Sequence, residues 1–207
     1  MVNEHYFDNI NSEIQAYLLG FITADGTIND TRKTPVLQVH ISTKDDYIVR
    51  LLENEIGNTV KTYYSPDGKR VAFRTSSEYL CNTLRKYYIM PRKTGYEELA
   101  IDILPSNLLS HYIRGLIDGD GWICNTKLKA GGVRKNIGFC GSELACEQLR
   151  DHFTSLLDTY PVKVSKVKGK NNYKINYASK TDIQRILRYI YGGATVFLER
   201  KYIEAIA

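Results

Sequence analysis

LLGFITADG at residues 18–26 and IRGLIDGDG at residues 113–121 decide the fold of this 207-residue chain. Each is an apolar run that ends in Asp-Gly, and each closes a pattern typical of a helix. A carboxylate in the last turn opposes the helix macrodipole, which favours cations there by roughly 0.3–1 kcal/mol. The glycine that follows is a common helix terminator. One such ending would suit an ordinary capped helix, but two at matching places indicate that Asp25 and Asp120 are needed side by side.

Small residues one helical turn apart line each stretch. They are Gly20 and Ala24 in the first, and Gly115 and Gly119 in the second. Residues four apart lie on one face of a helix, so two such faces can pack with their backbones close together. Packing about a pseudo-twofold axis would bring both helix C-termini, and both aspartates, to one place.

The composition is that of a globular protein, with 43% hydrophobic and 25% charged residues. No apolar run approaches the roughly 18–20 residues of a membrane span, so we expect no membrane partner. The polar residues 1–11 resemble neither a signal nor a transit peptide. The four cysteines lack the spacing of a zinc site or a disulfide framework. We therefore expect a protein that is not secreted and acts in the cytoplasm, an organelle or a phage-infected cell.

Charge is distributed unevenly along the chain. The formal net charge is +5, of which residues 1–104 contribute −2 and residues 105–207 contribute +7. A basic half suits a polyanionic partner such as nucleic acid, although an excess of this size also occurs on ordinary solvated surfaces.

The order of predicted elements is repeated. Each motif helix is followed by two strands, a helix, a hairpin and a further helix, with hairpin turns at residues 65–68 and 169–171. Thr43 is the predicted N-cap of the second helix, and Ser106 is that of the second motif helix. This predicts two domains of order αββαββα, an N-terminal repeat at 1–104 and a C-terminal repeat at 105–207.

An Arg-Lys pair also follows the last helix of each repeat. Lys93 lies 68 positions after Asp25, and Lys201 lies 81 positions after Asp120. The difference of 13 fits the longer loops of the second repeat, notably residues 127–134. We interpret the two lysines as equivalent.

A pair of adjacent carboxylates predicts a cation between them. Two such groups repel, and the pKa of one rises unless positive charge is near. Mg²⁺ prefers hard oxygen ligands and accepts phosphate oxygens as well. Two-metal sites clamp the attacking and leaving oxygens of a phosphodiester displacement. The alternative is two capped core helices whose Asp-Gly turns are structural only.

With these motifs the chain resembles the LAGLIDADG homing endonucleases, in the single-chain form with two motifs. LPSNLLSHYIRGLIDGDGWI at residues 104–123 and YIYGGATVFLERKY at residues 189–202 also match the family, and the likeness spans essentially the whole chain. It implies a mixed α/β (α+β) fold in which the motif helices pack at the centre and the antiparallel sheets form a saddle over the DNA major groove. It also implies cleavage of both strands across the minor groove, leaving 3′ overhangs.

The resemblance implies roles for particular residues. The predicted catalytic residues are Asp25, Asp120, Lys93 and Lys201. The predicted metal ligands are the carboxylates of Asp25 and Asp120 and the backbone carbonyls of Ala24 and Gly119. Mg²⁺ is the expected cofactor, with Mn²⁺ as a substitute and Ca²⁺ binding without supporting cleavage.

Two positions depart from the family pattern. Motif one has Thr23 where motif two keeps Asp118. That position usually serves helix packing, so we expect little loss of activity. Ile41 lies near the place where some members have a polar active-site residue, which leaves the positioning of water open.

Alternation along the strands separates core from DNA-facing side chains. Val39 and Ile41 are predicted core, as are Val71 and Phe73, and likewise Tyr173, Ile175 and Tyr177 in the second repeat. Arg and Gln read guanine and adenine edges, whereas Lys more often contacts phosphate. The predicted DNA-binding residues are polar side chains of the outward strand faces and adjoining loops: Asn29, Thr31, Lys33, Gln38, His40, Lys61, Tyr63, Arg70, Arg74, Lys163, Lys166, Lys168, Lys170, Lys174 and Asn176.

We therefore expect a monomeric, Mg²⁺-dependent, site-specific endonuclease that cuts double-stranded DNA at a long target and serves intron or free-standing gene mobility. A first rival reading is a catalytically idle DNA- or RNA-binding protein of the same fold, either a regulator or an intron maturase. The loss of an acidic residue would mark it, and both are present. A second rival reading is a strand-specific nickase.

Overall fold

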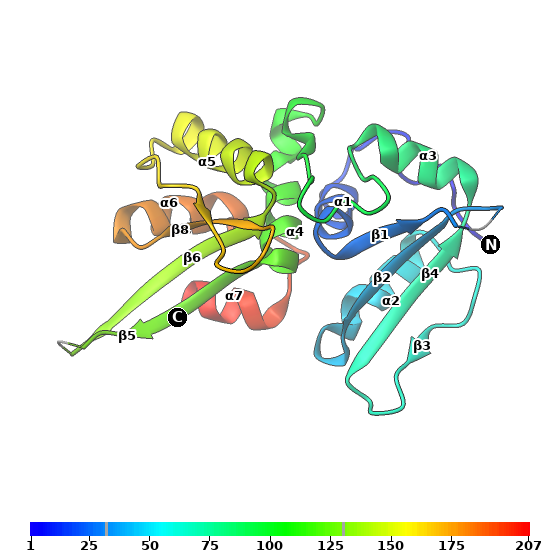
Figure 1. The fold of residues 1–207 in the computed structure, drawn as a ribbon, viewed down its shortest axis with the longest axis horizontal. Helices are drawn as coiled ribbons and strands as arrows, with labels where there is room; N and C mark the ends of the chain where they lie inside the picture. Colours follow the sequence, from blue (N-terminus) through cyan, green and yellow to red (C-terminus); the bar gives the residue numbers. More distant parts are fainter. Residues whose placement is uncertain (32, 130) are drawn as a thin grey trace.

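Two central helices organise the computed structural model, which describes residues 1–31, 33–129 and 131–207. They are α1 (Glu13–Asp25) and α4 (Leu109–Asp120), the two motif helices. A four-stranded antiparallel sheet lies on either side of this pair (Figure 1). The expected fold, two pseudo-symmetric halves of mixed helix and sheet around the motif helices, is confirmed.

The N-terminal sheet has the strand order β1-β2-β4-β3. Its strands are β1 (Gly26–Asn29), β2 (Val36–Ser42), β3 (Tyr63–Tyr64) and β4 (Arg70–Ser76), and its helices are α2 (Asp46–Glu55) and α3 (Glu78–Lys86). Val39 of β2 and Phe73 of β4 are partners in the strand register, and both side chains are fully buried. Their neighbours therefore point to the opposite, solvent-facing side.

The C-terminal sheet has the equivalent order, β5-β6-β8-β7. Its strands are β5 (Gly121–Lys127), β6 (Val133–Gly141), β7 (Ser165–Lys166) and β8 (Tyr173–Tyr177), and its helices are α5 (Glu143–Leu157), α6 (Lys180–Tyr191) and α7 (Glu199–Ile206). Short 3₁₀ helices are η1 (Thr43–Asp45), η2 (Ala100–Asp102) and η3 (Ser106–Leu108). Within the described ranges, no helix is long and apolar enough to cross a bilayer.

Glycine lets the central helices touch backbone to backbone. A Cβ atom built on Gly20 would lie 1.9 Å from the carbonyl oxygen of Tyr112, and one on Gly115 would lie 2.1 Å from that of Tyr17. Real Cβ atoms do not approach a backbone oxygen so closely, so any side chain here would force the helices apart. The predicted role of the small residues is confirmed.

Two tyrosine bridges repeat across this interface. The Tyr17 hydroxyl donates to Asp118 Oδ2 at 2.9 Å, and the equivalent Tyr112 hydroxyl donates to Thr23 Oγ1 at 3.3 Å. Asp118 also accepts from the Tyr191 hydroxyl at 2.6 Å. Both positions where the motifs differ therefore serve packing, as expected, and Thr23 keeps a partner of its own.

Some local predictions are wrong. Ser42, rather than Thr43, caps η1 by accepting from the backbone N–H of Lys44, because the Thr43 hydroxyl donates to the Gly68 carbonyl instead. Ser106 begins η3, and α4 starts three residues later without a side-chain cap. The sequence from Thr27 to Lys33 has the pattern of a strand, but the strand ends at Asn29, and Arg32 within that run is outside the described residues.

Candidate active site between the helix ends

Asp25 and Asp120 are the last residues of α1 and α4, so the helix pairing fixes where both carboxylates lie. A Cβ atom on Gly119 would be 2.4 Å from the Cβ of Ala24 and 3.1 Å from Asp25 Oδ2. The Asp25 carboxylate thus lies against the end of the other helix. Only a residue without a side chain fits at 119.

The electrostatics of the two aspartates show that they share one site. Burial and then the Asp120 carboxylate raise the pKa of Asp25 to about 6. Burial also raises the pKa of Asp120, while Lys93 and Lys201 oppose the rise. The two lysines therefore offset the burial of the two carboxylates only in part. A divalent cation fits such a pair of hard oxygen donors.

The ligand set from side chains is small. In the part of the chain that the structure describes, no group of three or more His, Cys, Asp or Glu side chains gathers at metal-binding distance. A cation held by Asp25 and Asp120 would complete its shell with backbone carbonyls, water or phosphate oxygens, which is the usual habit of Mg²⁺.

The two predicted lysines cap the two central helices. Lys93 Nζ donates to the carbonyls of Thr23 at 2.5 Å and Ala24 at 2.9 Å. Lys201 Nζ donates to four carbonyls at the end of α4: Ile117 at 2.6 Å, Asp118 at 2.6 Å, Gly119 at 3.3 Å and Gly121 at 2.7 Å. Burial lowers the pKa of Lys93 and lowers that of Lys201 to about 8. Each ammonium cancels the negative end of a helix that also terminates in a carboxylate.

This capping occupies the carbonyls that the sequence suggested as metal ligands. The carbonyl oxygens of Ala24 and Gly119 each accept from a lysine. A carbonyl has two lone pairs, so this contact leaves one for a further partner. Their role as ligands stays a prediction.

A cavity of about 530 Å³ opens beside Asp25. Its walls combine the helix ends, residues of β2, β4 and the segments beside them, and one residue of α7: Asp25, His40, Ile41, Ser42, Asp45, Lys69, Arg70, Gly119 and Arg200. The outward face of the sheet and the Asp25 carboxylate therefore border one hollow.

The outward face of the N-terminal sheet is cationic. Gln38 lies between Thr27 and Arg74 in the strand register, and Ser42 lies opposite Arg70. Burial, Arg74 and Arg70 all lower the pKa of His40, so its imidazole is neutral near pH 7. Guanidinium and amide groups of this kind can pair with base edges or phosphates.

The outward face of the C-terminal sheet carries a neutral network as well as the cations Arg134 and Lys174. The Trp122 indole N–H donates to Asn176 Oδ1 at 3.2 Å, and Asn176 Nδ2 donates to Asn136 Oδ1 at 3.4 Å. A Cβ on Gly138 would lie 2.2 Å from the Trp122 ring, so the ring lies flat on the neighbouring strand. The side chains of Trp122, Asn176 and Asn136 are thus hydrogen-bonded to one another.

The alternation predicted from the sequence is confirmed. The outward residues on strands are Asn29, Gln38, His40, Tyr63, Arg70, Arg74, Lys174 and Asn176. Lys166 is on β7, and the remaining predicted DNA contacts are exposed loop residues: Thr31, Lys33, Lys61, Lys163, Lys168 and Lys170. None of these predicted loop lysines lines the cavity beside Asp25, whereas Lys69, in the turn before β4, does.

Sequence reasoning missed several outward or site-facing residues. On the strands these are Thr27, Trp122, Arg134 and Asn136, all on the same face as predicted residues. Extending the period-two pattern through the whole of β5 and β6 would have found them. Around the aspartates they are Asp45, Glu97 and Arg200. Asp45 and Glu97 come from segments without a local signal, whereas Arg200 directly precedes Lys201 and could have been found from the Arg-Lys pair.

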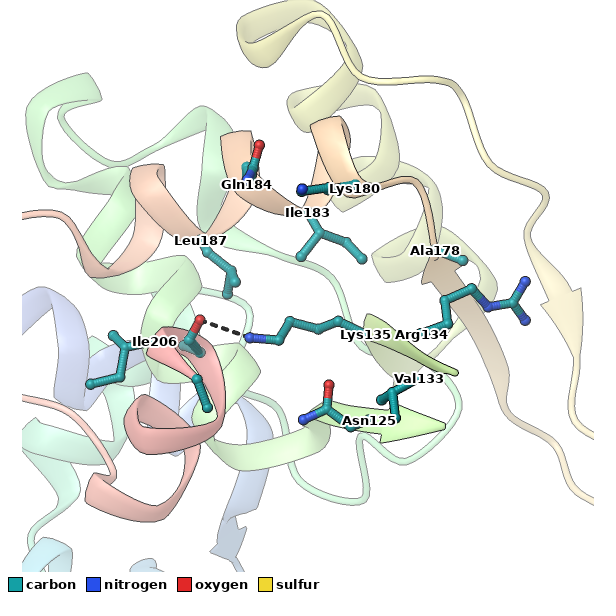
Figure 2. Close-up of a pocket in the computed structure, with 12 residues that line it drawn as sticks. Asn125, Val133, Arg134, Lys135, Ala178, Lys180, Ile183, Gln184, Leu187 and Ile206 are labelled. Atoms are coloured by element: carbon teal, nitrogen blue, oxygen red, sulfur yellow. Dashed lines mark hydrogen bonds between the residues drawn. The ribbon is translucent and has the colours of Figure 1, made fainter. Parts of the chain in front are cut away.

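A second cavity, of about 560 Å³, lies on the opposite, helix-covered side of the C-terminal sheet. Figure 2 shows Ile183 and Leu187 of α6 along one wall, and Lys135 extending towards α7, where it donates to the Ala205 carbonyl at 3.1 Å. No carboxylate side chain is among the described residues that line it. It is therefore separate from the chemistry at the helix ends.

Comparison with known proteins identifies the fold. No family model and no curated protein matches the sequence. Among solved structures, the LAGLIDADG homing endonuclease I-GzeII in complex with its DNA target is similar, with a TM-score of 0.65 and 12% identity over 91% of this chain and 86% of that one. I-SmaMI bound to its uncleaved DNA target in the presence of calcium ions is similar with a TM-score of 0.65 and 14% identity, over 95% of this chain and 90% of that one. I-LtrWI bound to target DNA is similar with a TM-score of 0.63 and 14% identity, over 97% of this chain and 88% of that one. The chain has the LAGLIDADG homing endonuclease fold.

Proposed function

We propose that this protein is a site-specific, divalent-metal-dependent endonuclease that cuts both strands of a long DNA target. The observation that carries the proposal is the pair of aspartates at the touching ends of α1 and α4, where burial raises the pKa of both carboxyls and the Asp120 carboxylate adds to the rise at Asp25. A purely structural helix end would gain nothing from two buried carboxylates. The fold and the DNA-bound state of its structural neighbours agree with the proposal.

The residues divide the work between holding metal and holding DNA. Asp25 and Asp120 would bind the cations, for which we propose Mg²⁺. When bound, such ions polarise the scissile phosphate and lower the pKa of an attacking water. Lys93 and Lys201 hold the helix ends in place and offset charge near the phosphates. The cationic N-terminal sheet and the basic loops of the second half would bind the DNA backbone and read bases.

The proposal extends to the oligomeric state, the cleavage product and the biological role. Because one chain supplies both aspartates, a monomer suffices for cutting both strands. We propose 3′ overhangs, a role in intron or free-standing gene mobility, and action in the cytoplasm, an organelle or a phage-infected cell.

The test is cleavage of a supercoiled plasmid. The plasmid carries the two DNA sequences that flank the gene, joined directly to each other so that the gene itself is absent. We expect linear product with Mg²⁺, none with EDTA, and tight binding without cutting in Ca²⁺. In parallel, a randomised duplex library selected for binding in Ca²⁺ supplies a target independently of the genome. Selected duplexes that are bound but never cut with Mg²⁺ or Mn²⁺ would favour an idle regulator or maturase.

A strand-specific nickase is the second candidate, and the unequal surroundings of Asp25 and Asp120 favour it over a protein that only binds nucleic acid. The cavity beside Asp25 contains Arg200 and Asp45, whereas Glu97 is the acidic neighbour of Asp120. Stable accumulation of nicked circles by the unmodified protein, cut always in one strand, would establish this candidate.

A further inference from the structure

Two adjacent residues of α7 point to different halves of the molecule. Lys201 is bound by the end of α4, in its own half. Arg200 turns the other way and donates through Nε and Nη2 to Asp45 Oδ1 and Oδ2, at 2.9 and 2.8 Å. The pair joins residues 155 positions apart and links the start of α7 to the start of α2.

Asp45 is committed to this contact. It stands at the N-cap position of α2, where aspartate usually accepts from the helix N–H groups, yet its side chain makes no capping bond. Its carboxylate is only 10% exposed, and both oxygens bind Arg200. A carboxylate so buried is stable only while its partner is present.

Arg200 has donors to spare, and they border the Asp25 cavity. A guanidinium has five N–H groups. Asp45 is its only acceptor in the described part of the chain, and half of the Arg200 side chain, 51%, is exposed. It lines the same hollow as Asp25, His40 and Arg70. A guanidinium fixed on one edge and open on the other suits a phosphate oxygen.

The equivalent position in the first repeat lacks this arrangement. Arg92 precedes Lys93 as Arg200 precedes Lys201, but Arg92 is exposed and has no acidic partner among the described residues. The acidic neighbour of Asp120 is Glu97, whose carboxylate accepts from the Gly95 backbone N–H at 3.0 and 3.1 Å. The two ends of the site therefore differ in one anchored cation.

We propose that Arg200 contacts the DNA phosphate at the Asp25 end of the site, and that Asp45 is the positioning residue that holds it there. This inference rests on the proposed nuclease function and deepens it. One of the two strand cuts depends on a contact between halves, and the other does not.

The test follows each strand separately on the plasmid and on a duplex labelled at either 5′ end. In Arg200→Ala we expect one strand to be cut about 100-fold more slowly, the effect of removing one preorganised donor, so that nicked circles accumulate. Asp45→Asn should slow the same strand about tenfold, and chiefly in kcat rather than KM, because Arg200 is present but loosely held. Arg50→Ala is the matched control, since Arg50 pairs with Asp46 at 2.6 Å within one helix.

A double variant separates a phosphate contact from a structural link. In Asp45→Arg/Arg200→Asp the ion pair can re-form, so thermal stability should recover towards that of the unmodified protein. Cutting of the affected strand should stay slow, since the cation now sits on α2. Recovery of both stability and cutting would overturn the phosphate contact and leave only a structural link.

Binding distinguishes a failed inference from a failed function. If the unmodified protein binds a selected duplex in Ca²⁺ but never cuts it, the nuclease proposal fails. The Arg200 contact is then judged by salt dependence, where loss of one phosphate contact lowers the slope of log K against log salt by about 1. An unchanged slope, or equal slowing of both strands in a protein that does cut, overturns the proposal for Arg200.

Discussion

The Asp25 and Asp120 ends of the central helices share a backbone design but differ in their surroundings. Each helix ends in an aspartate, is capped by a lysine and packs through glycine on the other. Around this core the Asp25 end faces a cationic sheet and Arg200, whereas the other half presents a self-bonded network of Trp122 and asparagines. The comparison shows that packing preserves symmetry where two backbones touch and permits divergence where DNA or water would lie.

The largest expected effect tests whether the two ends are equal in chemistry. Asp25→Asn and Asp120→Asn should each lower double-strand cleavage by about 1000-fold, or about 4 kcal/mol, because each removes a carboxylate that we propose as a metal ligand. Linear product from the plasmid is the measurement, and duplex binding in Ca²⁺ is the control that should change little. Cutting at the original rate by either variant would remove that aspartate from the mechanism.

The second test disrupts the close contact between α1 and α4 from either helix. Gly20→Ala and Gly115→Ala each place a methyl group about 2 Å from a backbone oxygen of the other helix, so we expect a loss of about 3 kcal/mol in the free energy of unfolding. That corresponds to a drop of roughly 10 °C in Tm. Gly68→Ala is the control, because a Cβ there meets nothing within 4 Å and only its positive φ of 68° is strained. Equal losses in all three variants would contradict close helix contact.

The central pair could be predicted from sequence because its signal is local. Gly20, Ala24, Gly115 and Gly119 sit at helical spacing, and each run ends in Asp-Gly, so both the helix contact and the meeting of the aspartates follow from one face of each helix. The strand faces could be predicted for the same reason, since alternation is a property of neighbouring residues.

The features that could not be predicted from the sequence depend on residues that are far apart along the chain. Asp45 has the pattern of a helix cap, and only the fold shows that its carboxylate binds Arg200, 155 positions away. The edge strands β3 and β7 pair over two residues each, although the Thr, Tyr and Val residues that flank them favour longer strands. Propensity cannot tell how far an edge strand finds a partner.

The third test compares the two lysine caps. Lys201 is bonded to four carbonyls and Lys93 to two. Methionine keeps the length of the side chain but leaves these acceptors without a charged donor. We expect Lys201→Met to lower the free energy of unfolding by about 2 kcal/mol and Lys93→Met by about 1 kcal/mol. Denaturant titration measures both, and a larger loss in Lys93→Met would contradict the unequal capping.

The last effect is a gain in the free energy of unfolding rather than a loss, and it depends on pH. The pKa of Asp25 is raised to about 6 in the folded protein, so folding favours its protonated form. That contribution is complete below about pH 4 and is lost as the pH rises through 6. Asparagine mimics the protonated group at every pH. Asp25→Asn should therefore raise the free energy of unfolding by about 1–2 kcal/mol at pH 8, allowing for solvent screening, and leave it unchanged at pH 4.

Thermal unfolding at the two pH values measures this difference, and added Mg²⁺ sharpens it. A cation that binds only the folded protein raises Tm by mass action. The unmodified protein should gain more from Mg²⁺ than Asp25→Asn, because the variant has lost one of the carboxylates that repel each other in the absence of metal. A variant that is no more stable at pH 8, yet gains equally from Mg²⁺, would place the cation away from Asp25 and make Asp120 the only acidic ligand.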